Sequence, residues 1–129
     1  IYREMPLNSI WEGAGNIMAL DLLRALRKAD AAAALAHELA PAKGMHPALD
    51  RLAAQLPLRV EEMATEMEAR RLAQDVALAV QAALLARTAP LAVFAAFCDS
   101  RIGGHWGYSF GSLNAATAFD AIIDRARPH

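Results

Sequence analysis

The stretch IWEGAGNIMALDLLRAL, residues 10–26, decides the fold class of this chain. Four apolar side chains recur in it at spacings of three, at Ile17, Leu20, Leu23 and Leu26, and Asp21 and Arg24 belong to a separate polar stripe. This spacing is typical of a helix that buries one face and exposes the other. We therefore predict a helix over residues 13–28.

Two interpretations of Glu12 are open from the residues alone. Ser9 and Glu12 have the spacing of a capping box, in which each side chain satisfies a free amide at a helix start. Alternatively, Glu12 is a base held beside a bound molecule, because Gly13 and Gly15 leave room for other groups to come close. The chain opens at Ile1 without an initiator methionine, so we expect it to be a piece of a longer sequence.

The rest of the chain is helical by pattern as well. Thirty-one of the 129 residues are alanine, the strongest helix former, whereas strand-forming Val, Thr and Tyr are scarce. Prolines at positions 41, 47, 57 and 90 mark helix ends or first turns. We expect helices over 29–40, 47–56, 57–87, 90–101 and 115–126, a turn over 42–46 and a glycine-rich loop over 103–111. The prediction is an all-α bundle of five or six helices in one domain, residues 1–129.

The predicted helix over 57–87 carries two patterns. Its expected buried stripe is Leu72, Val76, Ala79, Val80, Ala83 and Leu84. Its first half carries Glu61, Glu62, Glu66 and Glu68, where a helix dipole favours negative charge.

Composition excludes several classes of function. The net charge is −1, which gives no general attraction to nucleic acid or to an anionic membrane. No apolar run reaches the ~18 residues of a membrane span. Cys98 is the single cysteine, so the chain forms no internal disulfide, and we expect a cytoplasmic protein.

Cysteine and histidine placement predicts no metal site. Cys98 follows an apolar run, and we expect a buried, unreactive thiol there. The four histidines are scattered and have neither the spacing of a helical ligand pair nor companion cysteines. They are His37, His46, His105 and His129.

Two quoted stretches resemble a known family. YREMPLNSIWEGAGNIMALDLLRAL, residues 2–26, is similar to the C-terminal helical domain of the flavin-dependent acyl-CoA dehydrogenases, and closest to their AidB-like, alkylation-response branch. FCDSRIGGHWGYSFGSL, residues 97–113, is similar to the end of that branch. The specific resemblance covers residues 1–28 and 94–113, and the alanine-rich middle is typical of many helical proteins.

The resemblance implies a role for each residue of the opening stretch. Glu12 would be the catalytic base that removes the α-proton of an acyl-CoA while hydride leaves the β-carbon for FAD. Ala14 and Asn16 would lie at the flavin, and Trp11 and Gly13 at the acyl-CoA substrate. Ala14 departs from the usual Thr or Ser, which removes one hydrogen bond to the flavin.

The resemblance also implies a domain organisation. Residues 1–28 would be the flavin and substrate segment with its helix, and residues 29–129 an additional helical extension. The complete protein would use FAD, an acyl-CoA substrate and an electron acceptor, and would assemble as a dimer or tetramer. The isolated fragment would be inactive, because most groups that hold flavin and substrate lie outside it.

Two alternatives to an enzyme fragment stay open. In the first, a helical module binds DNA through Arg24, Arg27 and Lys28, with Arg70 and Arg71 adding charge further along the chain. In the second, the chain is a helical oligomerisation domain whose apolar surface is covered by other copies. The near-zero net charge argues against the DNA module.

Overall fold

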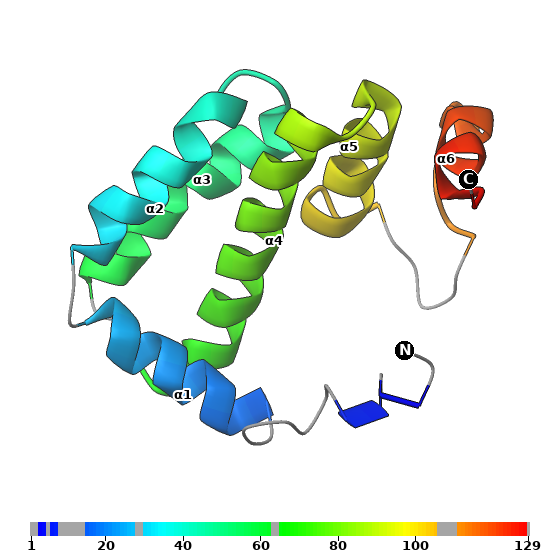
Figure 1. The fold of residues 1–129 in the computed structure, drawn as a ribbon. Helices are drawn as coiled ribbons and strands as arrows, with labels where there is room; N and C mark the ends of the chain where they lie inside the picture. Colours follow the sequence, from blue (N-terminus) through cyan, green and yellow to red (C-terminus); the bar gives the residue numbers. More distant parts are fainter. Residues whose placement is uncertain are drawn as a thin grey trace.

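The computed structural model describes residues 3–4, 6–7, 15–27, 30–62, 65–105 and 111–128. These residues form six α-helices, two short helical turns and no strand, so the predicted all-α fold is confirmed (Figure 1). The helices are α1 (Gly15–Leu26), α2 (Ala31–Leu39), α3 (Pro47–Glu61), α4 (Ala69–Thr88), α5 (Leu91–Phe97) and α6 (Phe119–Ala126). No helix in these ranges is both long and apolar enough to cross a membrane.

Helix α4 is the centre of the packing. It contacts α1, α2, α3 and α5, and Figure 1 shows it running through the middle of the molecule. Ala79, Ala82 and Ala83 have no exposed surface, and their small side chains let neighbouring helices approach closely. Leu84, expected on the buried stripe, is 45% exposed, because its position lies about 200° around the helix from the buried Ala82 and about 140° from the buried Ala79.

Helix α1 crosses one end of α4 (Figure 1). Its described part runs from Gly15 to Leu26, and residues 13 and 14 of the predicted helix lie outside the described residues. Ala19 and Leu23 are its buried residues, and Leu20 and Leu26 are partly buried against the core. Ile17, the first residue of the predicted stripe, is half exposed because the first turn of α1 extends beyond the body of the bundle.

The segment between α2 and α3 matches the prediction. Helix α2 ends before Pro41, which lies in a 3₁₀ turn, η2 (Ala40–Ala42). Gly44 follows in a left-handed conformation with φ of 80°, which glycine adopts without strain. Its N–H donates to Asp50 Oδ1 at 2.9 Å, which ties the turn to the first part of α3.

The predicted helix break at Pro57 is wrong. Pro57 lies inside α3, which continues to Glu61. A proline inside a helix removes one backbone hydrogen bond and costs about 3 kcal/mol. Leu56 and Val60 are buried on either side of Pro57, and their packing offsets that cost.

The helix break lies further along the chain than predicted. Glu62 caps the end of α3, and α4 begins at Ala69. Glu66 and Glu68 precede α4, where its dipole favours them, whereas Glu62 lies at the unfavourable end of α3, and the side chain of Glu61 lies outside the described part. Only half of the acidic run therefore has the role that we predicted.

The predicted helix over 90–101 is present, with a change of pitch. Helix α5 ends at Phe97 and continues as a π-helical turn, η3 (Cys98–Ile102). The N–H of Gly103 donates to the carbonyl of Cys98 at 2.7 Å and closes this turn. A Cβ on Gly103 would lie 2.8 Å from the backbone oxygen of Asp99, so the turn requires glycine there.

Helix α6 is shorter than predicted and lies at the edge of the fold. It begins at Phe119, because the Asn114 side chain accepts from Ala116 N–H and holds the preceding residues in a turn. It packs on α5, and none of its residues is buried (Figure 1).

Candidate functional site

The opening stretch of the predicted enzymatic site falls largely outside the described residues. The residues outside the described ranges include Trp11, Glu12, Gly13 and Ala14. Ser9, the partner of Glu12 in the alternative capping box, also lies outside them. Their roles stay predictions.

Asn16 is the one predicted flavin residue that the structure describes. It lies in the first turn of α1 and is exposed. No heavy atom beyond the immediate helix lies within 4 Å of the position that a Cβ on Gly15 would take. Among the described residues, nothing therefore covers Gly15, and the Asn16 side chain is exposed beside it.

The predicted DNA-facing residues lie at the other end of α1. Arg24 Nη1 lies 2.7 Å from Asp21 Oδ1, and both side chains are more than half exposed. A surface pair of this kind adds little stability, but it compensates part of the positive charge of this end. Arg27 is exposed beyond the last turn, and Lys28 lies outside the described residues. Contact of these residues with DNA stays a prediction.

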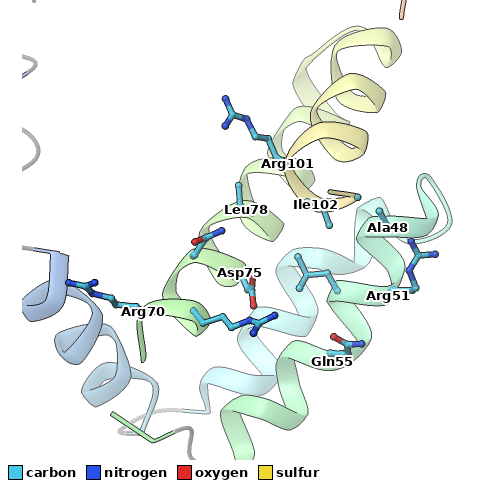
Figure 2. Close-up of a pocket in the computed structure, with 12 residues that line it drawn as sticks. Ala48, Arg51, Gln55, Arg70, Asp75, Leu78, Arg101 and Ile102 are labelled. Atoms are coloured by element: carbon cyan, nitrogen blue, oxygen red, sulfur yellow. The ribbon is translucent and has the colours of Figure 1, made fainter. Parts of the chain in front are cut away.

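A groove of about 710 Å³ lies between α3, α4 and η3. Figure 2 shows Arg51 and Gln55 on α3, Asp75 and Leu78 on α4, and Arg101 on η3 around it. The helix repeat explains this grouping, because residues 48, 51, 52 and 55 share one face of α3 and residues 71, 74, 75 and 78 share one face of α4. Partly buried apolar side chains form its floor, and polar side chains form its rim.

Positive charge dominates this groove. Four arginines line it, Arg51, Arg70, Arg71 and Arg101. Asp75 is the one carboxylate among the lining residues, and its Oδ2 accepts from Arg59 Nη1 at 2.7 Å. That pair is partly buried and joins α3 to α4, so the charge of Asp75 is already compensated by a residue outside the groove. The groove therefore carries an excess of about four positive charges.

A second polar cluster joins the starts of α3 and η3. The N–H of Ala48 donates to His46 Nδ1 at 3.2 Å, so His46 is the N-cap of α3. The proton of the neutral ring is then on Nε2, which lies 3.2 Å from Asp99 Oδ1. The ring also contacts the edge of Phe94. Because both ring nitrogens are engaged, His46 has a structural role and is not a free general base.

Cys98 has the role that the sequence predicted. It is free and fully buried in the core. Burial, and secondarily the negative charge of Asp99, raises the pKa of its thiol from 9.0 to about 11. The thiol is therefore protonated at neutral pH and unreactive as a nucleophile. In the described residues, no three histidine, cysteine or acidic side chains come together to hold a metal ion.

The sequence alone does not reveal the groove. Arg70 and Arg71 are adjacent in the chain, but Arg51 and Arg101 are distant from them. A helix-period search for polar side chains would find Arg51 with Gln55 on one face, and Arg71 with Gln74 and Asp75 on another. It would not show that these two faces meet.

Comparison with known proteins gives one match. The chain is 44% identical over 68 residues to AidB of Escherichia coli K12, a protein named provisionally as an acyl-CoA dehydrogenase. Over about half of its length, this chain is similar to AidB. The match covers 52% of the chain and confirms the resemblance to AidB-like proteins. It spans only 13% of the length of AidB, so most of AidB has no counterpart in the matched segment.

Two other comparisons give no match. No protein-family model matches the chain. No solved structure matches it either. The homology to AidB therefore rests on sequence identity, and the helical fold agrees with it.

Proposed function

We propose that this chain forms the C-terminal helical part of an FAD-dependent acyl-CoA dehydrogenase-like protein. The observation that carries the proposal is the 44% identity to AidB over 68 residues. The all-helical fold is consistent with the proposal. The reaction of the complete protein is the α,β-dehydrogenation of an acyl-CoA thioester.

In this proposal the residues before α1 act on the substrate. The carboxylate of Glu12 removes the α-proton of the thioester. Gly13 lets the thioester approach the backbone, and Trp11 lines the pocket and excludes water. A neighbouring indole and a dry site favour the protonated acid, which brings a carboxylate closer to the basicity that proton transfer needs.

The described start of α1 fits a bound flavin. Asn16 is exposed there, and its amide can both donate and accept hydrogen bonds. No described residue beyond the immediate helix lies within 4 Å of the position that a Cβ on Gly15 would take, which supports a close approach of a bound group there. Ala14 and Asn16 would contact the cofactor. When bound, FAD supplies the hydride acceptor for the β-carbon.

The test of this proposal uses the complete protein that contains this chain. We expect purified protein to show the visible absorbance of bound flavin and to lose it as acyl-CoA reduces the cofactor anaerobically. Glu12→Gln should slow flavin reduction by about 10²–10⁴-fold while flavin content stays unchanged, because an amide cannot take up the α-proton. Asn16→Ala is the matched control, since it should lower flavin occupancy rather than the rate of reduction per bound flavin.

Two results would contradict the proposal. A protein that takes up no FAD on refolding or reconstitution would remove the dehydrogenase function. Flavin reduction at an unchanged rate in Glu12→Gln would remove Glu12 as the base and leave the capping box with Ser9 as its role.

A second candidate function, self-association, is favoured by the exposed apolar side chains of α6. Phe119 and Ile123 are 43% and 53% exposed, and they lie four residues apart on one helix face. Leu91, on the neighbouring α5, is 67% exposed. We propose that copies of this chain associate through this edge of the fold.

Sedimentation velocity tests the association. We expect the 129-residue chain to sediment as an oligomer and Ile123→Glu to shift it to the monomer, because a carboxylate in an apolar interface is costly to desolvate. Ala121→Glu is the matched control on the same helix. A folded wild-type monomer at high concentration would contradict this candidate.

A further inference from the structure

The arginines of the groove between α3, α4 and η3 have no partner in the described part of the chain. No hydrogen bond or ion pair with another described residue engages Arg51, Arg70, Arg71 or Arg101. Other arginines are paired, Arg24 with Asp21, Arg59 with Asp75 and Arg87 with Glu38. Four unpaired arginines that line one groove give it a positive potential, which attracts anions.

We propose that this groove binds a small molecule that carries two or more linked phosphates. Guanidinium is a planar fork that matches phosphate oxygens in pairs, and all four cationic side chains of the groove are arginine, not lysine. This proposal uses no residue of the opening stretch, and its test on the 129-residue chain does not depend on dehydrogenase activity.

The spacing of the arginines indicates linked phosphates rather than a single one. Figure 2 shows Arg51, Arg70 and Arg101 on three different elements, with their guanidinium groups directed away from one another and that of Arg70 toward α1. A single phosphate contacts the arginines of one element, whereas a chain of phosphates can reach arginines on two. The excess of about four charges also matches the charge of an inorganic triphosphate near neutral pH.

The shape of the groove favours a small ligand over a nucleic acid. Its volume of about 710 Å³ is in the range of small-molecule sites. A rigid duplex contacts extended basic surfaces and cannot enter a concavity of this size. The floor contains the partly buried Leu52, Leu78 and Ile102, which offer an apolar surface to a nucleobase. The ligand is therefore either a nucleotide or an inorganic oligophosphate.

Isothermal titration of the 129-residue chain tests the proposal, with inorganic triphosphate as probe and orthophosphate as comparison. We expect triphosphate to bind at least about 10-fold more tightly than orthophosphate, and more weakly as salt is added. Arg71→Gln and Arg101→Gln should each weaken triphosphate binding by about 10-fold, the low end for hydrogen bonds to a charged group at an exposed site. Titration with ATP distinguishes the two ligand classes. Tighter binding of ATP than of triphosphate assigns a nucleotide to the groove, and equal binding assigns an inorganic oligophosphate.

Two controls separate the site from a general charge effect. Arg125→Gln removes the same charge from α6, away from the groove, and should change the affinity by less than about twofold. Arg101→Lys keeps the charge but loses the fork, so its affinity should lie between those of wild type and Arg101→Gln. All four variants change exposed side chains, and circular dichroism confirms that each is folded.

Three results would overturn the proposal. The first is no detectable heat or competition with triphosphate at millimolar concentration. The second is an equal loss of affinity in Arg125→Gln and Arg101→Gln. The third is binding of a labelled DNA duplex that depends on Arg71 and Arg101 but is not displaced by triphosphate, which would assign the groove to nucleic acid.

Discussion

Helices α4 and α6 lie at opposite extremes of burial in this molecule. Helix α4 is surrounded by four other helices, and its buried residues are mostly alanine. Helix α6 has larger apolar side chains on one face, yet none of its residues is buried. Burial therefore depends less on how apolar a helix face is than on whether neighbouring elements can approach it. Small side chains permit that approach around α4.

The largest expected effect comes from the core beside α4. Phe94 on α5 is 1% exposed, and Phe94→Ala should lower the free energy of unfolding by about 3–5 kcal/mol through lost burial and a residual cavity. Ile123→Ala on α6 should change it by about 0.5 kcal/mol or less. Urea unfolding at low protein concentration measures both. A similar loss of unfolding free energy in the two variants would show that α6 belongs to the core, and would contradict the contrast between α4 and α6.

The next effect is the pH dependence of the buried thiol. The pKa of Cys98 is raised from 9.0 to about 11, so the unfolded chain ionises this thiol before the folded chain does. Its contribution to stability is complete below pH 9 and is lost as the pH rises to about 11, by about 2–3 kcal/mol in total. Denaturant titrations of wild type and Cys98→Ala measure it. Parallel pH profiles of the two proteins would contradict a protonated, buried thiol.

The smallest of these effects is the cap of α3. His46→Ala leaves the N–H of Ala48 without its acceptor and should lower the free energy of unfolding by about 1 kcal/mol. His46→Asn can still accept from that N–H, so it should retain most of the stability. Thermal unfolding of the two variants compares them. If Asn destabilises as much as Ala, the contacts of the ring with Phe94 and Asp99 matter more than the cap.

Local patterns in the sequence were sufficient to predict that the helices and the turn at Gly44 exist. Alanine content, apolar spacing and Pro47 depend only on neighbouring residues, and the elements that they predict are present. Pro57 misled the prediction, because its local cost is offset by the burial of Leu56 and Val60. That compensation comes from other helices, so no local rule can include it.

Of the two candidate sites, one could be predicted from the sequence and the other could not. The resemblance of residues 2–26 to AidB-like proteins was readable from the sequence, and the identity to AidB agrees with it. The roles of Glu12, Trp11, Gly13 and Ala14 stay predictions outside the described residues. The arginine groove was not readable, because Arg51 and Arg101 are fifty positions apart and line the same groove only through the packing of α3 against α4 and η3.

The sequence by itself determined that this chain is helical, that its one thiol is buried and that its opening resembles a flavoprotein segment. Helix propensity and the spacing of apolar residues act over a few residues. Predictions based on them therefore do not require knowledge of the fold. Only the tertiary structure decided where α3 ends, which faces stay exposed and which charges gather. Those outcomes depend on contacts between residues far apart in the chain, whose energies no short stretch contains.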